Sequence, residues 1–181
     1  GGVGTVQRPQ RGDAGGQVAA QRLVLALALG DPAAQLDQAF GSFPGLIAAW
    51  GEYRGDAEAL FDGVTSLSWR ETADRVERIA ARLQADGLER GQAVAILGTT
   101  TVNYALIYLA AIRAGGCAAP LTTSASPDQL AGMAKDSGAI HLFIDREKRA
   151  ELTASGVDLG SAHHIMLDAA DGDARLPRRV G

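Results

Sequence analysis

Residues 68–97 read SWRETADRVERIAARLQADGLERGQAVAIL. The last five, 93–97, are apolar without alternation, which indicates a strand covered by helices on both faces. The preceding part carries apolar side chains at helical spacing, namely Ala73, Val76, Ile79, Ala80 and Leu83. A helix followed directly by a fully buried strand is a repeating unit of parallel α/β sheets, so this stretch predicts that fold class.

The helix in this stretch has its own start and stop signals. Ser68 and Glu71 form the pattern of a capping box, in which each side chain accepts a hydrogen bond from the backbone N–H of the other residue. Gly87 follows the last apolar position and can adopt the positive φ that ends many helices. The helix is therefore expected to begin at Trp69 and to end before Gly87.

Similar units follow along the chain. Residues 102–114 are apolar almost all round, which predicts a buried helix ended by the two glycines at 115 and 116. Ser126–Gln129 reads SPDQ, a second capping box with proline at the first helical position. The other elements expected are a strand beginning at Ala118, strands over 140–144 and 164–167, and a helix over 146–152.

The pattern before residue 68 differs. Apolar residues at helical spacing predict a helix over 43–53. Asp62-Gly63 lies between two short apolar runs and predicts a β-hairpin whose two turn residues have positive φ. The expected fold class is therefore α/β, a layered and mainly parallel sheet with helices on both faces, preceded by a β-hairpin.

Length and composition fit a packed domain or part of one. The chain has 181 residues, of which 46% are hydrophobic and 21% charged, as in ordinary globular proteins. Residues 1–30 are expected to be a poorly structured leader, 31–170 a folded unit and 171–181 a loose C-terminal segment. The apolar run 23–29 after Arg22 leaves open a secretory signal, although the same leucines could instead cover a sheet.

Charge and cysteine content argue against several classes of protein. The formal net charge is −4 and no basic face is visible, so no nucleic-acid partner is expected. The single cysteine, Cys117, cannot form an intrachain disulfide and is expected to be a small buried side chain, which fits a cytoplasmic location. No stretch approaches the roughly 20 apolar residues of a transmembrane helix.

Three quoted stretches together resemble a known family. They are residues 68–97, the run YALIYLAAIRAGGCAAPL over 104–121 and the run SPDQLAGMAKDSGAIHLFID over 126–145. Their order and spacing are similar to the amino-terminal part of the large domain of AMP-forming adenylating enzymes, the superfamily of acyl-CoA synthetases. Gln92 and Thr100 depart from the family pattern, which commonly has aspartate and asparagine there. Both are scaffold positions, so the expected fold is a partial subdomain of that large domain, over 31–170.

The resemblance implies a two-step ligase as the parent enzyme. ATP and a carboxylic acid would give an acyl-adenylate and pyrophosphate, and coenzyme A would then take the acyl group, with magnesium assisting. The sequences LGTTTVNY at 97–104 and PLTTSAS at 120–126 also resemble the adenylation domain of carboxylic acid reductases. A non-catalytic α/β binding module stays a third alternative. The expected partners are the carboxylic acid, coenzyme A and the remainder of the same enzyme chain.

The chain lacks the phosphate-binding loop that the resemblance calls for, a Ser/Thr/Gly-rich loop ending in lysine. Lys135 and Lys148 are its only lysines, and neither follows a glycine-rich turn. The threonine-rich runs 99–101 and 122–124 are expected to cap helices and fill loops. We therefore assign no catalytic, cofactor-binding or metal-binding residue, and expect this fragment alone to be inactive and to bind no cofactor.

Other chemically suggestive side chains have simpler explanations. His163 and His164 are adjacent on an expected strand and would point to opposite faces, so they cannot easily share a metal ion. Asp168, Asp171 and Asp173 do not follow the order of a calcium loop. Trp50 and Trp69 are expected to pack in the core, and no common cleft can be assigned to Asp136, Asp145 and Glu147.

Overall fold

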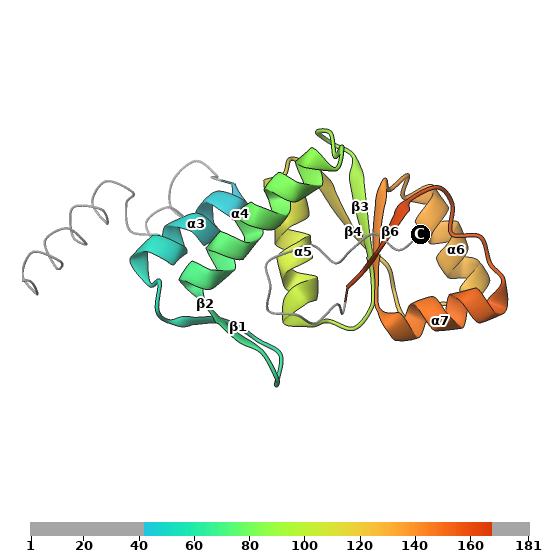
Figure 1. The fold of residues 1–181 in the computed structure, drawn as a ribbon, viewed down its shortest axis with the longest axis horizontal. Coiled ribbons are helices and arrows are strands. Elements are labelled where there is room, and N and C mark those ends of the chain that lie inside the picture. Colours follow the sequence, from blue (N-terminus) through green and yellow to red (C-terminus); the bar gives the residue numbers. More distant parts are fainter. Residues whose placement is uncertain (1–41, 168–181) are drawn as a thin grey trace, which may run out of the picture.

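The computed structural model describes residues 42–167 (Figure 1). The predictions for residues 1–30 and 171–181 lie outside this range. The described helices are α3 (Phe43–Tyr53), α4 (Trp69–Ala85), α5 (Val102–Arg113), α6 (Pro127–Asp136) and α7 (Arg146–Ser155). The strands are β1 (Glu58–Phe61), β2 (Ser66–Ser68), β3 (Ala93–Leu97), β4 (Cys117–Pro120), β5 (His141–Ile144) and β6 (His163–Met166).

The main sheet has four parallel strands in the order β4-β3-β5-β6. The chain leaves β3 through α5 and enters β4 on one side of it, then passes through α6 to β5 on the other side of β3. Strands β1 and β2 form a separate antiparallel hairpin, which projects from the body in Figure 1. This arrangement confirms the predicted fold class.

Alternate residues of β3 face two different cores. Val94 and Ile96 belong to the core on the side of α3, α4 and α5, and Ala95 and Leu97 to the core on the side of α6 and α7. Residues 94–97 are all fully buried. Helices thus cover both faces, as the unbroken apolar run predicts, and Figure 1 shows the sheet between the two groups of helices.

The helices on the first face are layered on one another. Aromatic rings join α3 to α4, since Trp50 stacks on Trp69 with ring centroids 5.6 Å apart. Arg113 of α5 pairs with Glu77 of α4 at 2.6 Å, in an exposed position. The two tryptophans are half-buried between helices, and only Trp69 packs against the core, so the predicted core position holds in part.

Both predicted capping boxes are present. The Ser68 hydroxyl accepts from the N–H of Glu71, whose carboxylate accepts from the N–H of Ser68 at 2.9 Å. Ser126 and Gln129 make the equivalent pair at the start of α6. Gly87, with φ 95°, follows α4 and confirms the predicted stop.

Two predictions need correction. The hairpin turn has only one residue with positive φ, Gly63, because the connection runs over four residues, 62–65, rather than two. Cys117 is exposed rather than buried. It lies on β4, at the end of the strand order, where the neighbouring strand β3 covers one side only.

Candidate functional site

The four parallel strands all end at one edge of the sheet. In sheets of this kind, ligands bind outside the carboxyl ends of the strands, where the order of strands reverses direction. Here the reversal lies between β3 and β5, because β4 is on one side of this pair and β6 on the other. The loops that follow Leu97 and Ile144 are therefore the first place to look for a site.

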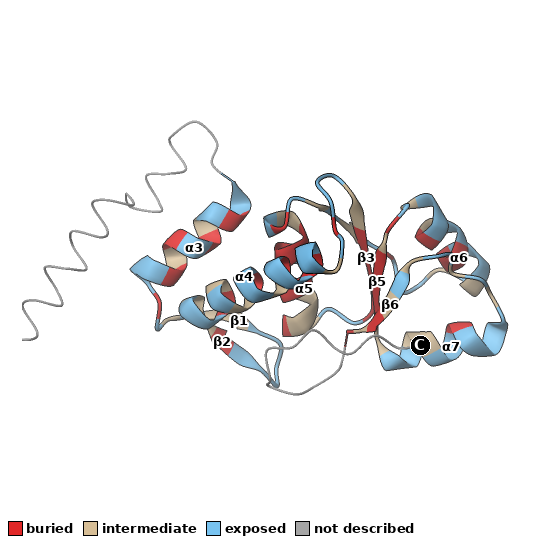
Figure 2. Cartoon of the chain, turned by 45° about the horizontal axis from the view of Figure 1, so that its top comes forward, coloured by how far each residue is buried: buried red, intermediate tan, exposed pale blue. Residues whose placement is uncertain are grey.

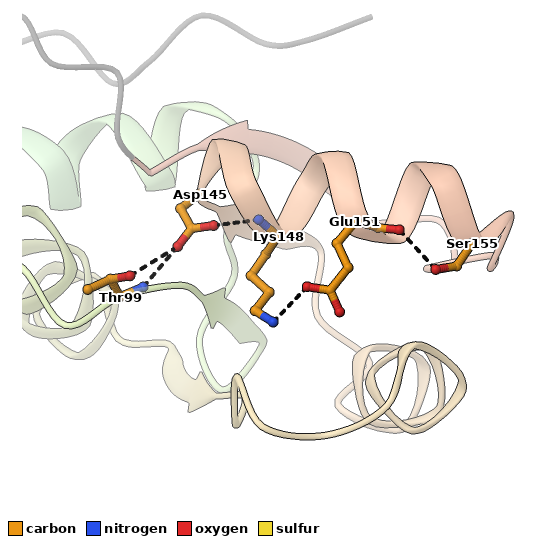
Figure 3. Close-up of polar contacts among 5 residues, drawn as sticks. All are labelled: Thr99, Asp145, Lys148, Glu151 and Ser155. Atoms are coloured by element: carbon orange, nitrogen blue, oxygen red, sulfur yellow. Dashed lines mark hydrogen bonds and ion pairs between the residues drawn. The ribbon is translucent and has the colours of Figure 1, made fainter.

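Asp145 occupies this point. Its carboxylate accepts a hydrogen bond from the backbone N–H of Thr99 at 2.9 Å and another from the N–H of Lys148 at 2.8 Å, as Figure 3 shows. The second bond makes Asp145 the N-cap of α7. One carboxylate thus joins the loop after β3 to the helix after β5.

Gly98 allows this close approach. A Cβ at this position would lie 2.8 Å from Oδ2 of Asp145 and 2.9 Å from a methyl group of Leu167. Both distances are shorter than real Cβ contacts, so a larger residue would displace the carboxylate from the loop. Gly98 is needed here for space and not for an unusual φ.

The side chain of Lys148 is engaged along its own helix. Its ammonium group pairs with Glu151 at 2.7 Å along α7, and this hydrogen bond raises the pKa of the lysine. Figure 3 shows its side chain turned toward Glu151, while only its backbone N–H reaches Asp145. The other lysine, Lys135, pairs with Asp158 at 2.9 Å.

The threonine-rich runs act locally. The Thr101 hydroxyl accepts from the N–H of Tyr104 as the N-cap of α5, which confirms the predicted capping role. The hydroxyls of Thr122 and Ser124 are 2.9 Å apart in the loop after β4. The hydroxyls of Thr101, Thr122 and Ser124 therefore have hydrogen-bond partners within the chain.

Asp62 connects the hairpin loop to α5, a contact that the sequence pattern around it did not indicate. Its carboxylate accepts from the N–H of Val102 at 2.8 Å and from those of Val64 and Thr65 at 3.1 and 2.8 Å. The hydrogen bond from Val102, followed by those from Thr65 and Val64, lowers the pKa of this carboxyl group. The hairpin loop is thus tied to the first turn of α5, next to the carboxyl edge of the sheet.

The two adjacent histidines lie on β6, as predicted. His163 is exposed and its ring is 5.9 Å from that of His141, in an edge-on arrangement. His164 is half-buried, and loss of solvent, followed by the charge of Arg149, lowers its pKa. Between residues 42 and 167 no three His, Cys, Asp or Glu side chains are grouped to hold a metal ion.

The remaining carboxylates have different surroundings. Asp136 and Glu147 are exposed, whereas Asp145 is half-buried in the contacts above. Asp168, Asp171 and Asp173 lie outside the described residues.

None of the helices within 42–167 combines the length and apolar character that crossing a bilayer requires.

Known proteins resemble this chain over most of the described range. The sequence profile of the family described as AMP-binding enzyme matches residues 47–178. The 4-hydroxybenzoate--CoA/benzoate--CoA ligase of Rhodopseudomonas palustris is 31% identical over 126 residues, which are 70% of this chain and 23% of that ligase. The glycine betaine reductase ATRR of Emericella nidulans is 30% identical over 119 residues, 66% of this chain and 9% of the reductase.

A solved structure supports the same fold. The anthranilate CoA ligase AuaEII, solved with anthranoyl-AMP, superposes with a TM-score of 0.66 at 16% identity. The match covers 72% of this chain and 26% of that enzyme, so this chain corresponds to about a quarter of it. The family profile spans well over half of the 181 residues of this chain, so the chain belongs to the AMP-binding enzyme family.

Proposed function

We propose that this chain is the amino-terminal part of an AMP-forming acid–thiol ligase, an acyl-CoA synthetase of the cytoplasm. The observation that carries the proposal is the family match over residues 47–178. The benzoate--CoA ligase that is 31% identical supports coenzyme A as the acceptor. We place the folded portion that belongs to the adenylation domain at residues 31–170.

The proposed reaction has two steps. The carboxylate oxygen of the acid attacks the α-phosphorus of ATP, and the bond to pyrophosphate breaks, which leaves an acyl-adenylate. The thiolate of coenzyme A then attacks the carbonyl carbon, and AMP leaves with the electron pair of the acyl–oxygen bond. Adenylation thus replaces a poor leaving group with AMP, and the second step conserves the activation as a thioester.

This chain would contribute scaffold rather than chemistry. Its two lysines are engaged with Glu151 and Asp158, and the Asp145 carboxylate is occupied by two backbone N–H groups. Electrostatic stabilisation of a transferring phosphoryl group needs free donors or cations aimed at it. We therefore expect ATP, magnesium and coenzyme A to bind only in the longer enzyme, and the 181-residue chain alone to be inactive.

A reductase is the second candidate. The 30% identity to the glycine betaine reductase ATRR favours it specifically, over 66% of this chain. Both candidates share the acyl-adenylate and differ in the second reaction, because a reductase would convert the activated acyl group into an aldehyde with a hydride donor. The fate of the acyl group therefore distinguishes them.

The test measures pyrophosphate release with a panel of carboxylic acids. The polypeptide encoded by the whole reading frame should release pyrophosphate with ATP and at least one acid, and should form a thioester when coenzyme A is added. Aldehyde formation with NADPH, and no thioester, would instead favour the reductase. Turnover by the 181-residue chain alone would contradict the proposed scaffold role.

A further inference from the structure

The loop between β3 and α5 is held at both ends by carboxylates from other parts of the chain. Asp145, which follows β5, accepts a hydrogen bond from the N–H of Thr99 at 2.9 Å (Figure 3). Asp62, in the hairpin loop, accepts one from the N–H of Val102 at 2.8 Å. The held loop lies at the carboxyl edge of the sheet, where parallel sheets bind their ligands. Its position is therefore set by residues that are 46 and 40 positions away in the sequence.

The two oxygens of Asp62 accept from different elements. Oδ1 accepts from the N–H groups of Val64 and Thr65, and these bonds close the hairpin loop on itself. Oδ2 accepts from the N–H of Val102, the first residue of α5. The first N–H groups of a helix find no carbonyl partner within the helix, so they need an acceptor from elsewhere. One carboxylate thus joins the hairpin to the start of α5.

The base of the hairpin is anchored independently of Asp62. Leu67 is buried in the core on the side of α3, α4 and α5, and Leu60 packs against the same core. The tip, by contrast, exposes Phe61 and Val64, which are 64% and 93% accessible. Loss of the hydrogen bond between Asp62 and α5 should therefore loosen the tip and the start of α5 without unfolding the rest of the chain.

We propose that Asp62 is a positioning residue for the adenylation site of the longer enzyme. The hydrogen bond that it accepts from Val102 keeps the loop of residues 98–101 in the arrangement that binds substrate. This inference rests on the proposed function, because it places adenylation at this edge of the sheet. When only a fraction of the molecules hold the binding arrangement, the apparent affinity falls in proportion to that fraction, whereas turnover of the bound complex is unchanged. A loosened loop should therefore raise KM and leave kcat as it was.

Two substitutions remove this hydrogen bond from opposite ends. Asp62→Asn keeps one oxygen, which can still accept from Val64 and Thr65. Its NH2 group then faces the N–H of Val102, so two donors meet. Val102→Pro removes the N–H itself, and proline is favoured at the first position of a helix. Thr101 before it already has the extended backbone that proline requires of its predecessor, so this variant should fold.

The first experiment uses the 181-residue chain and does not depend on activity. Asp62→Asn, Val102→Pro and the double variant form a thermodynamic cycle, measured by urea unfolding. Each single variant should raise the unfolding equilibrium constant about tenfold, and the double variant by about the same factor, because both changes remove one hydrogen bond. A rise of about 100-fold in the double variant, as independent effects would give, would overturn the proposal.

The second experiment measures pyrophosphate release without coenzyme A, in the polypeptide encoded by the whole reading frame. Asp62→Asn and Val102→Pro should raise KM for the acid or for ATP about tenfold and change kcat by less than about twofold. Asp158→Asn is the matched control. Asp158 accepts from the N–H of Gly160 and pairs with Lys135, in the loop that enters β6 at the opposite edge of the sheet. This variant should leave both KM values unchanged.

The outcomes separate this inference from the proposed function. Unchanged KM values for both substrates in Asp62→Asn and Val102→Pro would overturn the inference, as would a fall in kcat alone, which indicates loss of folded enzyme. No pyrophosphate release by the unchanged long polypeptide would instead reject the proposed function. The thermodynamic cycle would then still decide whether Asp62 holds the start of α5.

Discussion

On one face of the parallel sheet α5 packs against β3 and β4 and is covered in turn by α4 and α3, whereas α6 and α7 cover the other face (Figure 1). The first core includes Phe143 and most of α5. The second core takes two buried residues from α6 and only Leu152 from α7. Figure 2 shows the corresponding exposure of most of α7.

The difference concerns how much apolar surface each face removes from water. Buried apolar area is the main favourable term in folding, so the face of α3, α4 and α5 should hold the larger share of the stability. Both tryptophans of the chain, Trp50 and Trp69, lie on this face. Tryptophan fluorescence therefore reports the first face, and far-ultraviolet circular dichroism reports both.

The largest effect is expected from Phe143→Ala. Phe143 is fully buried in the core of the first face, and removing a buried phenylalanine typically costs about 3–5 kcal/mol because a cavity remains. The free energy of unfolding from urea titration measures this loss. Phe61→Ala is the matched control, since Phe61 is 64% exposed on the hairpin and should change stability by about 0.5 kcal/mol or less.

Leu152→Ala removes the buried residue of α7 and tests the second face. The side chain is 1% exposed, and the loss should lie near the low end for leucine, about 2–3 kcal/mol, because an exposed helix can settle into the space. The midpoint detected by circular dichroism should shift more than the midpoint from tryptophan fluorescence. Coincident midpoints would show that the two faces unfold as one unit.

Gly98→Ala places a methyl group against Asp145 and Leu167, where the two faces meet at the carboxyl edge. The close contacts should cost about 1–3 kcal/mol, as other overpacked sites do. Gly132→Ala in α6 is the control, since a Cβ there meets nothing within 4 Å. That variant should gain about 0.5–1 kcal/mol from the better helix former. An unchanged Gly98→Ala protein would argue against the close approach of Asp145.

The capping boxes allow a further comparison between the faces, with smaller expected losses of stability. Ser68→Ala removes the cap of α4, and Ser126→Ala removes that of α6. Each should cost about 1 kcal/mol in thermal unfolding, because a lost cap leaves local N–H groups unpaired whatever the helix packs against. A loss confined to Ser68→Ala would show that α6 contributes little to the cooperative unit.

The sequence predicts the elements better than the contacts between them. Capping boxes, apolar periodicity and unbroken apolar runs are local signals, so α4, β3 and α6 could be placed from residues close together in the sequence. The contact of Asp145 with Thr99 joins residues 46 apart, and that of Asp62 with Val102 joins residues 40 apart. No local pattern encodes such distances.

The error at Cys117 has the same origin. The exposure of Cys117 depends on β4 being last in the strand order, which is decided by the crossover through α6 and not by the residues around the cysteine. Asp145 had a readable signal, since it directly follows a buried strand and precedes a helix, as an N-cap does. Its hydrogen bond from the N–H of Thr99 could not be predicted, because only the fold brings these two residues together.

The smallest effect expected is a pH dependence from His164, which is half-buried on β6 and lies within the influence of the charge of Arg149. Loss of solvent lowers its pKa below the ordinary 6.5, so the unfolded chain binds more protons than the folded chain just below pH 6.5. The free energy of unfolding should therefore be constant above pH 6.5 and fall as the pH drops below it. It should level off once the pH is below the pKa of the folded state.

Subtracting the His164→Asn profile from that of the unchanged protein isolates this contribution. The difference between the two profiles should be confined to the range below pH 6.5. Asp62 and Glu71, whose carboxyl pKa values are also lowered, change the free energy of unfolding only near and below their ordinary pKa values of 3.8 and 4.5. His163→Asn, on the exposed neighbour, should keep the pH dependence. Parallel profiles for the unchanged protein and His164→Asn would mean that the imidazole of His164 is as well solvated in the folded chain as in the unfolded one.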